Sequence, residues 1–120
     1  GMRVLILDDN EELRGFLALA LTEAGEDAVA IGDADEATTR LAEGSFDVFV
    51  VDSVLSDTDG VAIVQQLRNL PDWRDLKVVL MSPISTSLAR RVAKAAGCDE
   101  FLVKPFGPQQ LVESVKKLAR

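Results

Sequence analysis

Short apolar runs along the chain alternate with longer segments in which apolar residues recur every three or four positions. The short runs have the length and composition of strands that are buried on both faces of a sheet. The longer segments match helices that bury one face. The pattern predicts strands over residues 4–7, 28–31, 46–51, 78–81 and 101–103. It predicts helices over residues 13–24, 33–43, 61–70, 88–97 and 107–118.

The helix ends carry their own signals. Asp33 with Glu36 three residues later resembles a capping box. Gly25 and Gly97 stand where helices end, and Pro108 suits the first position of the last helix. Five strand–helix units in succession predict a doubly wound α/β fold, in which a parallel sheet carries helices on both faces. Ligands of such folds bind beyond the carboxyl ends of the strands.

The chain reads as one domain over residues 2–120, because no repeat or linker interrupts the pattern. Gly1 before Met2 is interpreted as the remnant of a cleaved tag. The apolar run 4–7 is too short for a signal peptide or a membrane span, so no membrane partner is expected.

Composition excludes several classes of function. The chain has no histidine, which removes His-dependent triads, His-metal catalysis and a phosphohistidine. Cys98 is the one cysteine, so neither an intramolecular disulfide nor a multi-cysteine zinc site can form, and a reducing cytoplasm is favoured. The net charge of −7 argues against nucleic-acid binding. Residues 1–60 carry 15 acids and 3 bases, whereas residues 61–120 carry 5 acids and 10 bases, so the halves present different surfaces.

Chemically useful side chains stand where the predicted strands end: Asp8, Asp9, Asp52, Ser82 and Lys104. Carboxylates brought together resist ionisation, and a divalent cation relieves their repulsion. Mg²⁺ takes one or two carboxylates together with water and phosphate oxygens. Lys104 and Ser82 are suited to hold a phosphoryl group, and Asp52 is the best-placed nucleophile for an aspartyl phosphate.

The chain resembles the receiver domain of two-component response regulators over essentially its whole length. The resemblance rests on an ordered set of motifs: Asp8-Asp9, Asp52 with a loop ending in Asp59-Gly60, Ser82, and Lys104-Pro105-Phe106. It implies a flavodoxin-like (βα)5 three-layer sandwich with sheet order 2-1-3-4-5. It also implies a phosphoprotein of phosphorelay signal transduction, which catalyses only its own phosphorylation and dephosphorylation and is no enzyme otherwise.

The resemblance also implies roles for single residues. Asp52 would accept phosphate from a histidine kinase or a histidine phosphotransfer protein. Asp8, Asp9, Asp52 and the backbone carbonyl of Val54 would bind Mg²⁺ or Mn²⁺, and Lys104 would contact the phosphoryl group.

A switch is implied beside these residues. Ser82 would turn toward the phosphoryl group and Phe101 would then turn inward. The peptide bond before Pro105 would be cis.

The fourth helix, fifth strand and fifth helix would form the output face, for a second copy of the chain or an acidic partner. Leu88, Val92 and Ala95 are expected to anchor the fourth helix only weakly, so that it can shift. The basic residues expected on this face are Arg90, Arg91, Lys94, Lys116, Lys117 and Arg120, although a solvated basic surface explains them equally well.

Three positions depart from the family pattern. Ser82 stands where threonine is more usual, a mild change that keeps the hydroxyl. Ser56 stands where proline often follows the acceptor loop, which predicts a less rigid loop. Pro83 stands where a small residue usually donates its backbone N–H to the phosphoryl group, and proline has no N–H. Pro83 therefore predicts altered phosphoryl-group kinetics.

Other interpretations stay open. Asp8 and Asp9 could cap a helix, Lys104 could be a surface lysine, and Phe101 a core aromatic. The chain could be a pseudo-receiver that binds proteins independently of phosphorylation, as Pro83 favours. A haloacid dehalogenase-type phosphohydrolase is the remote alternative, but it needs a second acid where this chain has Val54.

Overall fold

The computed structural model describes residues 1–119 of the chain. The elements of this part follow one another in the order β1 (Arg3–Leu7), α1 (Glu11–Glu23), β2 (Asp27–Ile31), α2 (Ala34–Glu43), β3 (Val48–Asp52), α3 (Gly60–Arg68), the 3-10 turn η1 (Pro71–Trp73), β4 (Lys77–Ser82), α4 (Ser87–Ala96), β5 (Glu100–Val103) and α5 (Pro108–Leu118). None of the helices described is long and apolar enough to cross a membrane.

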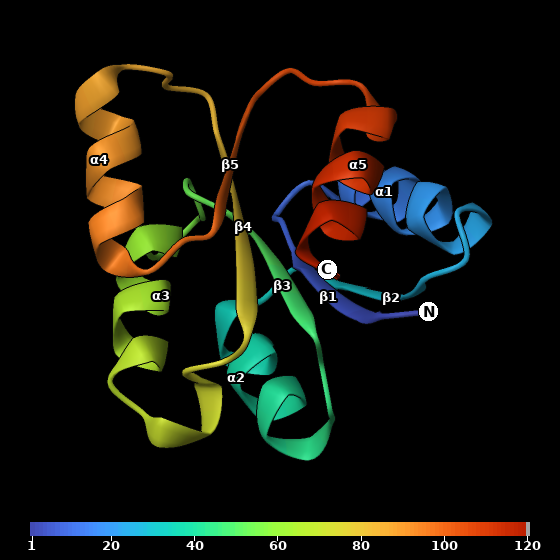
Figure 1. Ribbon diagram of the computed structural model, residues 1–120, viewed down its shortest axis with the longest axis horizontal. Helices are drawn as coiled ribbons and strands as arrows, with labels where there is room; N and C mark the ends of the chain where they lie inside the picture. The colour runs from blue at the N-terminus through green and yellow to red at the C-terminus, as the bar shows by residue number, and fades with distance from the viewer. Residues whose placement is uncertain (120) are drawn as a thin grey trace.

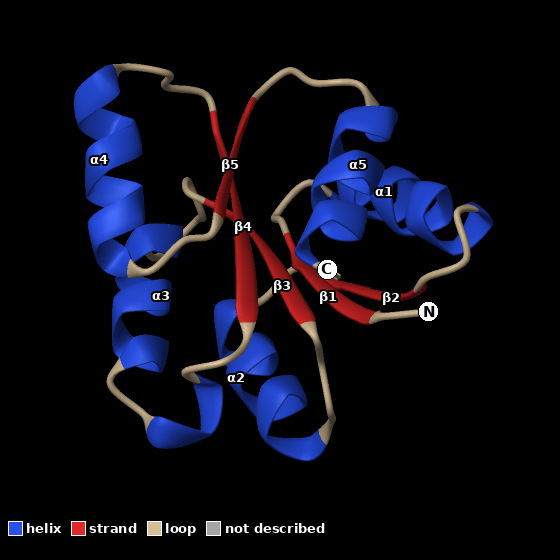
Figure 2. Ribbon diagram, in the orientation of Figure 1, coloured by secondary structure: helices blue, strands red, loops and turns tan. Residues whose placement is uncertain are grey.

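The five strands form one parallel sheet in the order β2-β1-β3-β4-β5. Helices α1 and α5 cover one face of this sheet, and α2, α3 and α4 cover the other (Figures 1 and 2). The predicted doubly wound α/β fold, its three layers and its strand order are therefore confirmed.

Side chains alternate between the two faces of the sheet along each strand, so the core consists of two clusters. In β1, Leu5 and Leu7 pack into the cluster under α2, α3 and α4, whereas Val4 and Ile6 pack into the cluster under α1 and α5. Successive side chains of a strand point to opposite faces, so a continuous apolar run feeds both layers. Every residue of β3 is buried, which places its last residue, Asp52, beneath the surface.

Local details differ from the sequence expectations. The Asp33 carboxylate caps α2, but it accepts from the backbone N–H of Asp35 at 2.8 Å, and the Glu36 side chain pairs with Arg40 at 3.6 Å. The expected capping box is therefore not formed. The turn η1 was not predicted either, because the predicted helix stops before Pro71 and no apolar pattern indicates an element directly after it.

The predicted anchors of α4 were wrong. Leu88 is 67% exposed and Val92 is 46% exposed, and Ala95 is exposed too. The buried residues of α4 are Ala93 and Ala96, which lie in its second half. The first half of α4 contains no buried residue, so little apolar surface attaches it to the core.

The second half of α4 is held by Arg68, the last residue of α3. Its guanidinium donates two hydrogen bonds to the Gly97 carbonyl (3.1 and 2.8 Å) and one to the Trp73 carbonyl (2.7 Å). Further bonds reach the Arg74 carbonyl (3.2 Å) and the Asp99 carboxylate (3.1 Å). One side chain thus ties together α3, η1 and the α4–β5 turn.

Candidate functional site

Two acidic side chains lie at the carboxyl ends of neighbouring strands. Leu7 of β1 is paired with Val51 of β3, so Asp8 and Asp52 follow at the same level of the sheet. Asp8 is 1% exposed and Asp52 is 6% exposed. Buried carboxylates need partners, because removal of an ionised group from water is unfavourable.

The loop after Asp52 returns to the sheet at once. Val54 and Asp59 form an antiparallel bridge, and the Gly60 N–H donates to the Ser53 carbonyl at 2.9 Å. A Cβ atom at Gly60 would collide with the backbone carbonyl of Asp52. Glycine therefore permits the close approach that positions the Asp52 backbone. The Asp59 carboxylate then caps α3 by accepting from the Val61 N–H at 2.8 Å.

Lys104 joins the two buried carboxylates. Its ammonium lies 2.8 Å from Asp8 Oδ2 and 3.0 Å from Asp52 Oδ2. It follows β5 directly, and the peptide bond to Pro105 is cis. The structure therefore brings together three of the predicted site residues, which lie up to 96 positions apart in the sequence. A hydrogen-bonded cation between two carboxylates offsets much of the unfavourable burial of their charge.

Burial and neighbouring charges shift the protonation equilibria of this cluster. Burial raises the pKa of Asp52, and the charge of Asp8 adds to this, while the hydrogen bonds from Lys104 and the Val54 N–H oppose it. Burial alone would lower the pKa of Lys104, but its bonds to Asp8 and Asp52 outweigh burial, so the pKa rises. The ammonium stays charged, and Asp52 is harder to ionise than an ordinary aspartate.

Asp9 does not join this cluster. Its Oδ2 atom accepts a hydrogen bond of 2.6 Å from the Ser56 hydroxyl, across the gap between the β1–α1 and β3–α3 loops. The Arg14 guanidinium donates to the backbone carbonyls of Asp8 (3.3 Å) and Asp9 (3.2 Å). Neither contact is predicted from the sequence. The sequence does carry a signal for the Arg14 contacts: a basic residue lies one turn into the helix that follows an acidic strand end.

Ser82 is buried at the end of β4 and forms a closed turn with Ile84. The Ser82 hydroxyl donates to the Ile84 carbonyl and accepts from the Ile84 N–H, each at 3.1 Å. Pro83 lies between them and has no N–H. In this arrangement the hydroxyl is occupied by its own loop rather than by the carboxylate cluster.

The predicted output face carries both basic and aromatic groups. The Arg90 guanidinium stacks on the Phe101 ring, 4.8 Å from its centroid. Lys117 pairs with Glu100 at 3.5 Å, and Lys116 pairs with Glu26 at 3.8 Å. Arg120 lies outside the described residues. The predicted basic stripe is therefore partly neutralised by the protein's own acids.

A sequence model of the response regulator receiver domain matches residues 4–116. The chain belongs to this family. Among solved structures, the receiver domain of the Francisella response regulator 1452 is 25% identical with a TM-score of 0.91, over 98% of this chain and 96% of that one. The response regulator protein TrrA from Thermotoga maritima, in complex with Mg²⁺ and BeF, is 28% identical with a TM-score of 0.84, over 98% of this chain and 99% of that one.

Curated relatives extend beyond the receiver domain. The transcriptional regulatory protein TcrA of Mycobacterium tuberculosis is 31% identical over 121 residues, which span all of this chain and 47% of TcrA. The transcriptional regulatory protein GltR of Pseudomonas aeruginosa is 26% identical over 50% of its own length. The chain therefore spans about half the length of the curated relatives that it matches.

Receiver domains generally bind Mg²⁺, and the site meets the requirements of that ion in part. Within residues 1–119, no group of three or more His, Cys, Asp or Glu side chains is arranged to hold a metal ion. Mg²⁺ nevertheless needs only one or two protein carboxylates, with water and phosphate oxygens at the other positions. Asp8 and Asp52 supply two carboxylates, and the Lys104 ammonium neutralises only one of the two negative charges. The oxygen ligands present therefore fit Mg²⁺. The three carboxylates of Asp8, Asp9 and Asp52 are not assembled.

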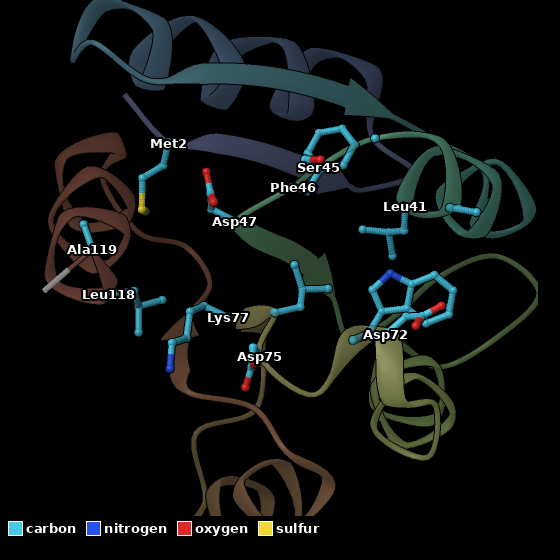
Figure 3. Close-up of a pocket in the computed structure, with 14 residues that line it drawn as sticks. Met2, Leu41, Ser45, Phe46, Asp47, Asp72, Asp75, Lys77, Leu118 and Ala119 are labelled. Carbon is cyan, nitrogen blue, oxygen red and sulfur yellow. The ribbon is translucent and has the colours of Figure 1, made fainter.

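A separate pocket of about 680 Å³ lies at the opposite end of the sheet (Figure 3). Its apolar lining includes Met2, Leu41, Phe46 and Leu118. The acidic residues Asp47, Asp72 and Asp75 lie beside them. None of the receiver domain's predicted site residues lines it. The amino ends of the strands meet here, whereas α/β sheets bind ligands at the carboxyl ends. The candidate site is therefore the carboxylate cluster.

Proposed function

We propose that this receiver domain accepts a phosphoryl group on Asp52 from a histidine kinase or a histidine phosphotransfer protein. The observation that carries the proposal is the Lys104 ammonium between the buried Asp8 and Asp52 carboxylates. This arrangement provides an oxygen nucleophile, a fixed cation and a second acid at one sheet edge. These groups are suited to phosphoryl transfer, in which positioning and charge stabilisation dominate.

In the proposed step, a carboxylate oxygen of Asp52 attacks the phosphorus of the donor. The phosphorus–nitrogen bond of the donor phosphohistidine breaks, its electron pair stays on the imidazole, and an acyl phosphate forms on Asp52. Lys104 would hold the phosphoryl oxygens once Asp52 is modified. Mg²⁺ or Mn²⁺, held by Asp8, Asp52, Asp9 and the Val54 carbonyl, would neutralise charge on those oxygens.

Output is proposed to pass through α4, β5 and α5. Ser82 would leave its turn with Ile84 to contact the phosphoryl group, and Phe101 would move with it. Added charge at one end of the sheet would thereby bias the position of α4. The recognised surface would be a second copy of the domain or an acidic partner. A cytoplasmic location belongs to this proposal, because Cys98 is a free thiol.

A pseudo-receiver that binds proteins without phosphorylation is the second candidate. It is favoured by the loop after β4, where Pro83 removes a backbone donor and the Ser82 hydroxyl is bonded to Ile84. Loss of one hydrogen bond to a charged group weakens an interaction by about 1.5–3 kcal/mol. That is roughly a ten- to hundredfold effect on the lifetime or the formation of the phosphorylated state.

Intact-mass spectrometry after incubation with acetyl phosphate and Mg²⁺ tests the proposal. The expected result is a gain of one phosphoryl group, absent from Asp52→Ala and from a Mg²⁺-free sample. The decay rate of the adduct then measures the effect of Pro83 against a Pro83→Ala variant. Absence of the adduct, together with failure of a beryllofluoride titration, would favour the pseudo-receiver.

A further inference from the structure

We propose that Ser56 is a positioning residue that holds the Asp9 carboxylate away from the metal site and so weakens Mg²⁺ binding. The observation is the 2.6 Å hydrogen bond from the Ser56 hydroxyl to Asp9 Oδ2. The inference rests on the proposed function, because it concerns the third carboxylate of the same magnesium site.

Hydrogen bonds hold the backbone around Asp9 in place. A move of the Asp9 carboxylate from Ser56 to the metal site therefore depends on its side-chain torsions. Arg14 holds the carbonyls of Asp8 and Asp9, and the Asn10 N–H donates to Asp8 Oδ1 at 2.8 Å. The Asn10 side chain in turn caps α1 at the Leu13 N–H. In the proposed role, Asp9 enters the site by rotation of its side chain and loss of the bond to Ser56.

The partner of Asp9 is also held in place. The β3–α3 loop is closed by the hydrogen bonds from Leu55 to Thr58 and from Gly60 to Ser53. Leu55 is only 8% exposed and anchors the loop in the core. The Ser56 hydroxyl is thus held by a closed loop and would not follow the Asp9 side chain into the metal site. Its hydrogen bond therefore competes with the metal for the Asp9 carboxylate.

A third carboxylate raises the affinity for Mg²⁺ only after the hydrogen bond between Ser56 and Asp9 is broken. A hydrogen bond between a hydroxyl and an exposed carboxylate is modest, so the expected penalty on the Mg²⁺ dissociation constant is about two- to tenfold. Removal of the hydroxyl abolishes the competition and leaves Asp8, Asp52 and Lys104 unchanged.

Isothermal titration of Mg²⁺ into the metal-free protein at neutral pH tests this role. We expect Ser56→Ala to bind Mg²⁺ about two- to tenfold more tightly than the unmodified chain. Ser56→Thr restores the hydroxyl and should restore the weaker affinity. Thr58→Ala is the matched control, since it deletes a hydroxyl of the same loop that bonds to no other side chain among residues 1–119. Urea unfolding of each variant verifies that it is folded.

The outcomes separate the inference from the proposed function. Equal Mg²⁺ affinity in Ser56→Ala and the unmodified chain, or weaker binding by Ser56→Ala, overturns the role of Ser56 and leaves the metal site intact. The same change in Thr58→Ala would assign the effect to loop mobility and overturn it too. Absence of Mg²⁺ binding in every folded variant overturns the magnesium site and, with it, the proposed function.

Discussion

Replacement of Lys104 by methionine removes the ammonium and keeps most of the side-chain volume. Asp8 and Asp52 then each lose one charged hydrogen bond, of 2.8 and 3.0 Å. Two such bonds are worth about 3–6 kcal/mol when fully buried. The Lys104 side chain is 21% exposed, so water compensates for part of the loss. We expect the free energy of unfolding to fall by about 2–4 kcal/mol at pH 7.

The pH dependence of this loss follows from the pKa shifts. Asp52 has a pKa raised above its ordinary 3.8, so its ionisation opposes folding, and stability falls as pH rises through the folded pKa. Lys104 lessens that fall by pairing with the carboxylate. Its own pKa is raised above 10.5, so this support is fully present at pH 4–7 and is lost only in strongly alkaline solution. The difference between Lys104→Met and the unmodified chain should therefore widen from pH 4 to pH 7.

Urea unfolding followed by circular dichroism measures both effects. For a domain of this size, with a slope of about 1.5 kcal/mol per molar urea, the midpoint should drop by about 1–3 M at pH 7. The double variant Asp52→Asn, Lys104→Met should recover part of the loss, because one of the two unpaired charges is gone. A midpoint at pH 7 equal to that of the unmodified chain, or an equal loss at pH 4 and pH 7, would refute the electrostatic account of the cluster.

Three further predictions concern the fold around the site. Arg68→Ala should lower the free energy of unfolding by about 2–4 kcal/mol, with little recovery in Arg68→Lys, because one ammonium cannot reach the acceptors of a planar guanidinium; urea midpoints at neutral pH measure it. Gly60→Ala should destabilise the domain by more than about 2 kcal/mol, because its Cβ would meet the Asp52 carbonyl. Gly15→Ala, in the open middle of α1, should instead stabilise the domain by up to about 1 kcal/mol. Thermal unfolding of the two variants compares these effects. Burial raises the pKa of the Cys98 thiol to about 11, so its reaction with a thiol reagent at pH 8 should be far slower in the folded domain than in urea.

Each of these has a result that contradicts it. A loss below about 0.5 kcal/mol in Arg68→Ala would mean that its hydrogen bonds are replaced by water without net effect. Equal melting temperatures of Gly60→Ala and Gly15→Ala would mean that the acceptor loop yields to a methyl group. Rapid labelling of Cys98 in the folded state would mean that the α4–β5 turn opens readily, which would also argue against the clamp formed by Arg68.

The sequence predicted the fold class and the meeting of three candidate site residues because both follow from short-range patterns. Continuous apolar runs identify strands that are buried on both faces, and parallel strands place their carboxyl ends together. Asp8, Asp52 and Lys104 each follow such a run, so their meeting needed no knowledge of side-chain torsions. The strand order came from the family resemblance, since right-handed crossovers alone leave several orders possible.

The remaining features depend on choices that the sequence pattern leaves open. The contact of Asp9 with Ser56 joins loops 47 positions apart and depends on one side-chain rotamer. In α4, residues spaced by three and four mark two possible stripes, one with Leu88 and Val92 and one with alanines. Burial of the larger residues was the natural expectation from hydrophobicity. In the structure α4 packs beside α3 and buries Ala93 and Ala96, an outcome that depends on tertiary packing.

On the output face proposed above, attachment of α4 through its second half would separate partner recognition from stability. The first turns of the helix expose Leu88 and Val92, which add little to the core. Substitutions at such positions change the surface offered to a binding protein while the free energy of unfolding stays nearly constant. Arg68 and the two buried alanines hold the end of the helix without a contribution from these outer residues. The surface that α4 would present to a partner is therefore open to substitution without compensating changes in the interior.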